Sequence, residues 1–209
     1  MTLFVTPEST LSYWRRNIAA VDPFLLAMAR ELVQPNTVVW DVGANVGLFS
    51  FAAAALGAQV MAVEPDPWLA NLIHRSTQLN QLPVKVLPAA VSDRRGTCQL
   101  HTPTEGRSSN SLDGDGAGQP VITMTLDSLL DYFPAPNVLK IDIEGMELPV
   151  LRAGQKVLEA RPRILCEVTA HHEAVASVLR DAHYEFFAAR AANRQPLQRP
   201  SRDTLAIPR

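Results

Sequence analysis

The sequence predicts a single α/β domain built on a mostly parallel sheet with helices on both faces. Short runs rich in Val and Ile alternate with longer helical patterns, which is the order of elements in a parallel sheet. The strand-like runs are apolar almost throughout, as expected for strands buried on both faces. The length of 209 residues suits one domain with a large core.

The first half of the chain repeats a strand, a turn and a helix. Asp66 and Pro67 are a favourable N-cap and first helical residue, and Asp22-Pro23 starts an earlier helix in the same way. The expected strands are residues 37–42, 59–64 and 84–88, and the expected helices are residues 22–33, 46–56 and 66–79.

The second half continues the pattern after an insertion. Strands at 97–101 and 121–126 flank a polar segment, residues 102–120, which holds four of the ten glycines and suits a functional loop. Strands at 138–143 and 163–168 are each followed by a helix, to about residue 160 and over 172–182. The last two strand-like runs, 184–188 and 204–207, have no helix between them, so we expect them to pair antiparallel at the sheet edge. The domain is thus residues 37–209, with an N-terminal extension at 1–36.

Composition excludes several classes of protein. The formal net charge of -2 is too small for a nucleic-acid or anionic-membrane binder that works by charge. The longest apolar stretch, residues 48–58, is too short to span a bilayer. Residues 1–12 show no secretory signal, and Cys98 and Cys166 are too far apart in sequence to suggest a metal site. We expect a cytoplasmic protein that contacts neither membrane nor nucleic acid.

The most specific local pattern joins the first strand to the first helix of the domain, where the chain reads DVGANVG from Asp41 to Gly47. A turn this tight needs residues that tolerate positive φ, which Gly43, Asn45 and Gly47 provide. With Ala44, they leave the backbone and the helix N-terminus open to a ligand. A dinucleotide loop would need a further glycine, and Asp41 would repel a pyrophosphate. Asp41 suits a ligand with an ammonium group, and S-adenosylmethionine carries an ammonium, a carboxylate and a sulfonium at one end.

Further cofactor contacts are expected at the next two strands. Glu64 ends the second strand, 23 positions after Asp41, where an acid can accept hydrogen bonds from both ribose hydroxyls. Pro65 stiffens the turn that follows. After the third strand, Ala90 and Val91 are small enough to leave space for adenine, and their backbone groups can bond to its rim.

Catalytic groups are expected where the fourth strand ends. Lys140, Asp142 and Glu144 alternate along it and share one face, so Lys140 is expected to pair with one of the carboxylates. Asp142 and Glu144 are candidate bases. Glu167 ends the neighbouring strand, and a cluster of the three carboxylates would raise the pKa of one of them toward the range of a general base. Nothing in the spacing demands a metal ion.

These motifs together resemble the FkbM-type S-adenosylmethionine-dependent methyltransferases. The segments DVGANVGLFS, VEPDP, AAVSD, LDSLL and KIDIEGME match in order and spacing over about residues 37–168, and TLAIP near the end resembles the last strand of that family. The resemblance implies a Rossmann-like, seven-stranded class I methyltransferase fold. It also implies O-methylation of a hydroxyl, or of a carboxyl, on a small metabolite such as a sugar or a polyketide-type compound.

Two other functions stay open at this stage. A dinucleotide-dependent oxidoreductase can use a similar sheet, although the glycine pattern is incomplete, and an inactive S-adenosylmethionine-binding module would keep the same loop. Ser108, Ser109, Asn110 and Ser111 in the insertion suit a lid that faces the substrate. Because the N-terminal extension is short, the site is either open or closed by a second subunit of a homodimer.

Overall fold

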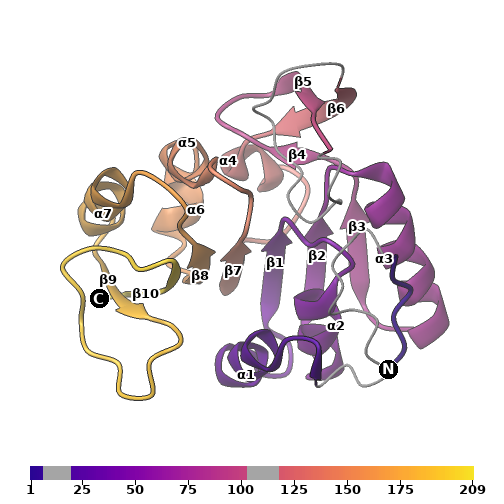
Figure 1. The fold of residues 1–209 in the computed structure, drawn as a ribbon, viewed down its shortest axis with the longest axis horizontal. Helices are drawn as coiled ribbons and strands as arrows, with labels where there is room; N and C mark the ends of the chain where they lie inside the picture. Colours follow the sequence, from indigo (N-terminus) through magenta and orange to yellow (C-terminus); the bar gives the residue numbers. More distant parts are fainter. Residues whose placement is uncertain (7–19, 103–117) are drawn as a thin grey trace.

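The computed structural model describes residues 1–6, 20–102 and 118–209. Within these residues the main sheet has seven strands in the order β3-β2-β1-β7-β8-β10-β9, and β10 is the strand that runs antiparallel to its neighbours (Figure 1). The predicted fold class and the antiparallel edge are therefore confirmed. The strands of this sheet are β1 (Val38–Val42), β2 (Gln59–Val63), β3 (Val84–Leu87), β7 (Val138–Ile141), β8 (Arg163–Glu167), β9 (Tyr184–Ala188) and β10 (Asp203–Pro208).

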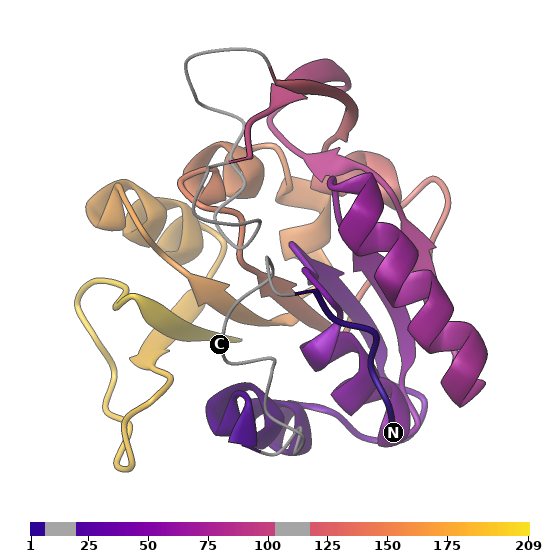
Figure 2. The ribbon, with the colours of Figure 1, turned by 45° about the vertical axis from the view of Figure 1, so that its right-hand side comes forward.

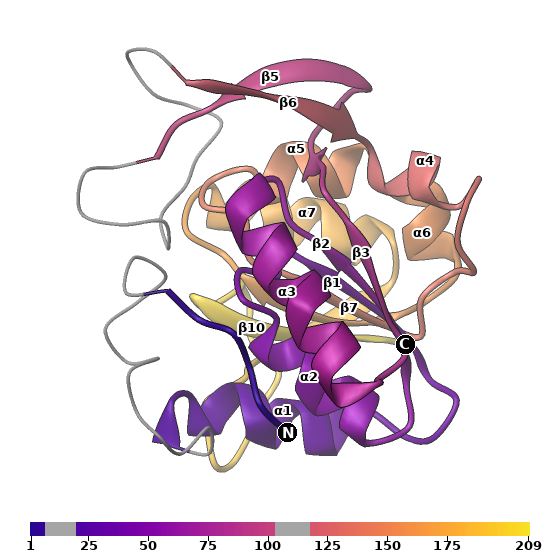
Figure 3. The ribbon, with the colours of Figure 1, turned by 90° about the vertical axis from the view of Figure 1, so that its right-hand side faces the viewer.

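Helices form a layer on each face of the sheet (Figure 3). On one face, α1, α2 and Ile73 of α3 share a core with Val39, Val138 and Leu165. On the other face, α4 to α7 enclose Trp40, Leu139 and Ile164. The first group of helices comprises α1 (Pro23–Leu32), α2 (Leu48–Ala55) and α3 (Pro67–Asn80), and the second comprises α4 (Leu126–Leu129), α5 (Glu147–Arg152), α6 (Gln155–Glu159) and α7 (His172–Asp181).

A second, three-stranded sheet lies beyond the end of β3 (Figures 1 and 2). It is formed by β4 (Ala90–Val91), β5 (Gly96–Leu100) and β6 (Gln119–Met124), with β6 in the middle. Most of the insertion predicted between β5 and β6, including Ser108 to Ser111, lies outside the described residues.

Two local differences from the sequence prediction have clear causes. The helix expected up to residue 160 is divided into α5 and α6 at Ala153 and Gly154, because glycine is unfavourable in the interior of a helix. Leu126 was expected in a strand, but it begins α4 because Thr125 and Ser128 form a reciprocal capping box.

The two ends of the chain are fastened to the domain. Residues 1–6 lie along α3, where the amide of Asn80 bonds to both the N–H and the C=O of Thr2. The C-terminal tail contains five arginines, and four of them pair with acids: Arg190 with Asp203, Arg194 with Glu31, Arg202 with Glu167 and Arg209 with Glu185. No helix in the described part of the chain is both long enough and apolar enough to cross a bilayer.

Candidate functional site

The loop between β1 and α2 has the backbone shape that its sequence predicts. Gly43, Asn45 and Gly47 have φ values of 75°, 53° and 85°. The N–H groups of Gly43 and Ala44 both donate to the carbonyl of Val63, at 3.0 and 3.1 Å, which holds the loop against the end of β2. This places the loop where β1, β2 and β7 end side by side.

Asp41 lies beneath this loop with a fully buried side chain. Its Oδ2 atom accepts hydrogen bonds from the N–H of Ser50 at 3.0 Å and from the Ser50 hydroxyl at 2.6 Å. Ser50 is in the first turn of α2, so Asp41 caps that helix from nine residues away. The structure thus places Asp41 in a buried, supporting position, and its contact with the ammonium group of a ligand stays a prediction.

Lys140 of β7 occupies the centre of the buried polar network. Its Nζ atom donates to the carbonyl of Gly43 at 2.6 Å and lies 3.1 Å from Asp41 Oδ1 and 3.3 Å from Asp142 Oδ2. Burial acts to lower the pKa of Lys140, but the two carboxylates outweigh it and raise that pKa. The pairing expected from the sequence therefore joins Lys140 to two acids, and both are beside the β1–α2 loop.

Glu64 lies directly after β2 and faces the same loop. Its Oε2 atom accepts a bond from the N–H of Asn45 at 2.8 Å, and its Oε1 atom accepts one from the N–H of Asp66 at 3.0 Å. Burial raises the pKa of the Glu64 carboxyl to about 8, although both N–H groups act to lower it. Glu64 lies next to Pro65 and the start of α3. Each of its carboxyl oxygens has a further lone pair that can accept a hydrogen bond from a hydroxyl group.

Ala90 and Val91, predicted to face adenine, are both buried and form the short strand β4. One edge of β4 pairs in parallel with Thr123 and Met124 of β6. The sequence did not indicate this strand, because a pair of residues carries no periodicity. β4 is the outer strand of the small sheet, so its other edge carries no strand within the described residues.

Three carboxylates meet beyond the ends of β7 and β8, as the sequence predicted. Burial, followed by repulsion from Asp142 and Glu167, raises the pKa of Glu144. Burial and the neighbouring Asp142 also raise the pKa of Glu167, while its bond to Arg202 opposes this rise. Asp142 pairs with Lys140, and Glu167 accepts a 2.6 Å bond from Nε of Arg202. Glu144 has no hydrogen bond or ion pair within the described residues, and its φ of 36° is unusual for a non-glycine residue.

Glu147, the first residue of α5, is a further acid near this cluster. It is almost fully buried, and it accepts bonds from the N–H of Gly145 at 3.0 Å and from the hydroxyl of Thr169 at 3.2 Å. These contacts hold the turn that carries Glu144 and Gly145, both of which have left-handed backbones. The long-range contact to Thr169 had no signal in the sequence.

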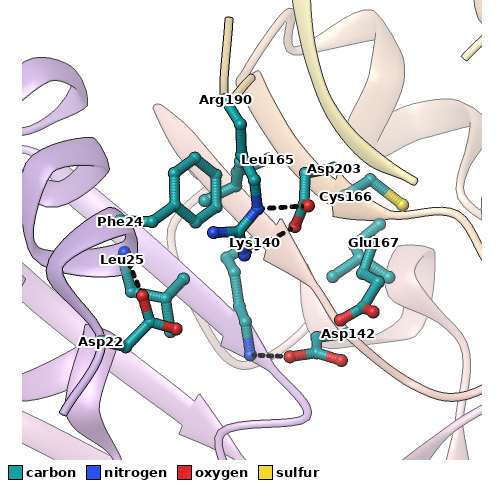
Figure 4. Close-up of a pocket in the computed structure, with 11 residues that line it drawn as sticks. Asp22, Phe24, Leu25, Lys140, Asp142, Leu165, Cys166, Glu167, Arg190 and Asp203 are labelled. Carbon is teal, nitrogen blue, oxygen red and sulfur yellow. Dashed lines mark hydrogen bonds and ion pairs between the residues drawn. The ribbon is translucent and has the colours of Figure 1, made fainter. Parts of the chain in front are cut away.

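A small pocket of about 60 Å³ opens beside Asp142 and Glu167 (Figure 4). Its other side is formed by Asp22 and Phe24 at the start of α1 and by Arg190 after β9. The guanidinium of Arg190 lies 3.9 Å from the centre of the Phe24 ring and pairs with Asp203 at 2.5 Å. Sequence reasoning missed these wall residues, because they come from elements that are far apart in the chain.

Comparison with known proteins identifies the family to which this site belongs. Residues 41–188 match the model of the methyltransferase FkbM domain, and they include the loop, Glu64 and the carboxylate cluster; the start of α1, Arg190, Arg202 and the last strand lie outside the match. The chain belongs to the FkbM methyltransferase family. The resemblance seen in the sequence is thereby confirmed, and the loop, Glu64 and the carboxylate cluster are parts of a methyltransferase domain.

Several methyltransferases are similar to this chain in sequence or in fold. The hexuronic acid methyltransferase AglP of Haloferax volcanii is 26% identical over 171 residues, which cover 79% of this chain and 70% of that protein. A TehB-like SAM-dependent methyltransferase from Corynebacterium glutamicum superposes with a TM-score of 0.54 at 13% identity, over 94% of this chain and 93% of that one. A SAM-dependent O-methyltransferase from Thermotoga maritima superposes with a TM-score of 0.52 at 13% identity, over 95% and 69% of the two chains. The FkbM chain therefore has the class I methyltransferase fold.

Family and fold imply S-adenosylmethionine as the methyl donor, and the residues present fit it. Asn45 Oδ1 is buried and has no hydrogen-bond partner among the described residues, so an acceptor is left for an ammonium or hydroxyl group. Glu64, which accepts a hydrogen bond from the N–H of Asn45, offers a second acceptor. No group of three or more His, Cys, Asp or Glu side chains in the described ranges is arranged to hold a metal ion.

Proposed function

We propose that this FkbM methyltransferase transfers the methyl group of S-adenosylmethionine to a hydroxyl group of a small, sugar-like metabolite. The observation that carries the proposal is the position of Glu144. It is a half-buried carboxylate with a raised pKa and no partner among the described residues, at the edge of the sheet next to the β1–α2 loop. An acceptor hydroxyl needs such a base and little else, because methyl transfer is a direct displacement.

The loop and the end of β2 are the proposed donor site. Gly43, Ala44, Asn45 and Gly47 would surround the amino-acid end of the donor, with Asn45 Oδ1 accepting from its ammonium. Glu64 would accept the ribose hydroxyls, and the free edge of β4 at Ala90 and Val91 would lie against the adenine. When bound, S-adenosylmethionine supplies an electrophilic methyl group on a sulfonium.

The three carboxylates have different proposed roles because their partners differ. Glu144 would take the proton of the acceptor hydroxyl at one of its carboxylate oxygens. Asp142 is held by Lys140 and Glu167 by Arg202, so these two acids would orient the acceptor by accepting hydrogen bonds from its other hydroxyls. A polyol acceptor suits a site with several carboxylate acceptors.

The sugar-like acceptor is supported by two separate observations. AglP, the relative from Haloferax volcanii, is described as a hexuronic acid methyltransferase. In this chain, the small pocket beside Asp142 is lined by the carboxylates of Asp142 and Glu167, which can accept hydrogen bonds from hydroxyl groups of an acceptor. A carboxyl acceptor is the second candidate, because that relative is a hexuronic acid methyltransferase and a hexuronic acid carries a carboxyl group.

Two measurements test the proposal. Calorimetric titration should show binding of S-adenosylmethionine and S-adenosylhomocysteine but not of NAD, which separates a methyltransferase from a dinucleotide-dependent oxidoreductase. Transfer of a labelled methyl group should then occur to a pyranoside with free hydroxyls. Donor binding without transfer to any pyranoside or uronic acid would favour an inactive binding module.

A further inference from the structure

Lys140 joins the two halves of the proposed site. Its Nζ atom is hydrogen-bonded to Gly43 O at 2.6 Å on the donor side, and it lies 3.3 Å from Asp142 Oδ2 on the acceptor side. The side chain is 6% exposed, so solvent cannot replace these contacts. An ammonium group has three N–H donors, and three oxygens, from Gly43, Asp41 and Asp142, surround this one.

The third contact extends the connection into the first helix of the domain. Asp41 Oδ1 lies 3.1 Å from Nζ, while its Oδ2 atom caps α2 through Ser50. Lys140 is therefore connected to the β1–α2 loop at three places. It pairs with Asp41 before the loop, it bonds to the carbonyl of Gly43 within the loop, and it reaches the start of α2 through Asp41 and Ser50. The same loop also contacts β7 directly, because a Cβ atom at Gly43 would lie 1.8 Å from the carbonyl oxygen of Asp142.

We propose that Lys140 is a positioning residue that sets the relative placement of the donor loop and the acceptor-side carboxylate Asp142. A buried lysine whose purpose was only to neutralise Asp41 would need one ion pair. The shortest contact of this lysine is instead its hydrogen bond to the uncharged carbonyl of Gly43, on the loop that would hold the donor. Its loss would let that loop and the end of β7 move apart, which would harm alignment of the reacting atoms.

The inference rests on the proposed function, and a charge-compensated pair of variants tests it. Lys140→Met alone leaves Asp41 buried without its cation, so that variant is expected to lose stability or to fail to fold. The double variant Lys140→Met/Asp41→Asn removes both charges and should regain thermal stability. We expect it nevertheless to bind S-adenosylmethionine at least tenfold more weakly than the Asp41→Asn variant, with kcat reduced at least tenfold and KM for the acceptor changed less.

Lys140→Arg provides a second measurement that does not depend on recovery of the double variant. Arginine keeps the charge but presents its donors in a plane, so it cannot place three donors around one point. It should fold normally and show kcat at least tenfold below that of the wild-type chain, while Lys156→Met, at an exposed position on α6, should behave as the wild-type chain does.

The outcomes distinguish failure of the proposed function from failure of the role of Lys140. A wild-type chain that does not bind S-adenosylmethionine would overturn the proposed function and, with it, the role of Lys140. If the wild-type chain binds the donor and transfers its methyl group, the proposed function stands. The role of Lys140 alone would then be overturned if either the Lys140→Arg variant or a stable double variant retained full donor affinity and kcat.

Discussion

Gly43 and the main-chain carbonyl of Asp142 are in such close contact that a Cβ atom at residue 43 would lie 1.8 Å from the Asp142 oxygen. This contact brings the loop after β1 against the end of β7, and it joins two motifs that are almost 100 residues apart in the sequence. The glycine is needed both for this approach and for its φ of 75°.

Replacement of Gly43 by alanine is expected to be severe. Gly43→Ala must move either the loop or the end of β7, and we expect the free energy of unfolding to fall by about 3 kcal/mol or more, with donor binding lost. Gly57→Ala is the matched control, because Gly57 has a φ of 90° but lies far from the loop. It should lose about 1–2 kcal/mol and keep its donor affinity. Urea unfolding and calorimetry measure both quantities, and equal donor affinity in the two variants would contradict the prediction.

The buried carboxyl of Glu64 predicts a dependence of stability on pH. Its pKa rises from 4.5 in the unfolded chain to about 8 in the folded one, so the folded state holds the proton more tightly. This contribution to stability is therefore fully present below about pH 4.5 and is lost as the pH rises through 8. Glu64→Gln should flatten this part of the curve of unfolding free energy against pH. An unchanged slope between pH 5 and pH 9, in urea unfolding, would show that Glu64 is already ionised at low pH in the folded chain.

Removal of the proposed base should affect chemistry more than donor binding. Glu144→Gln keeps the size of the side chain but cannot accept a proton, and we expect kcat to fall by about 10²-fold or more with the affinity for S-adenosylmethionine within a factor of about three. Glu159→Gln, at an exposed position at the end of α6, is the control and should leave kcat unchanged.

The pH profile of the wild-type chain provides an independent check on the same residue. The base must be ionised to act, and the pKa of Glu144 lies above its ordinary value, mainly because of burial and of repulsion from Asp142 and Glu167. The rate should therefore decline, as the pH falls, at a pH above the ordinary pKa of a glutamate. A Glu144→Gln variant that retains the full rate and the same acid limb would exclude this residue as the base.

The cap that Asp41 provides to α2 can be weakened without disturbing Lys140. Ser50→Ala removes the 2.6 Å hydroxyl bond to Asp41 but leaves the 3.0 Å bond from the Ser50 N–H. We expect the free energy of unfolding to fall by roughly 1–2 kcal/mol, because a buried carboxylate loses one donor. Ser177→Ala, at an exposed position on α7, should change it by less than about 0.5 kcal/mol. Thermal and urea unfolding measure both variants, and an equal loss of stability in the two would contradict the cap.

Local patterns predicted most of the fold because the relevant physics is local. The Asp66-Pro67 start of α3 is seen in the structure as a side-chain cap on the N–H of Trp68, and the apolar runs became the strands of the sheet. The capping box at Thr125 and the short strand β4 were missed. The capping box is local, but it has Ser in place of the usual Glu or Gln at its third helical position. The strand β4 has two residues and depends on its pairing with β6, so it carries no periodicity.

The candidate site divides along the same line. The sequence by itself determined which acids end the strands, the left-handed loop at Gly43 to Gly47 and the family. These features depend only on residue type and spacing. Only the tertiary structure decided that Asp41 is buried as a helix cap, that Lys140 contacts both Gly43 and Asp142, and that Arg202 pairs with Glu167 while Glu144 has no such partner within the described residues. Ion pairs and burial depend on which distant segments are brought together in space, and no local pattern of residues records that choice.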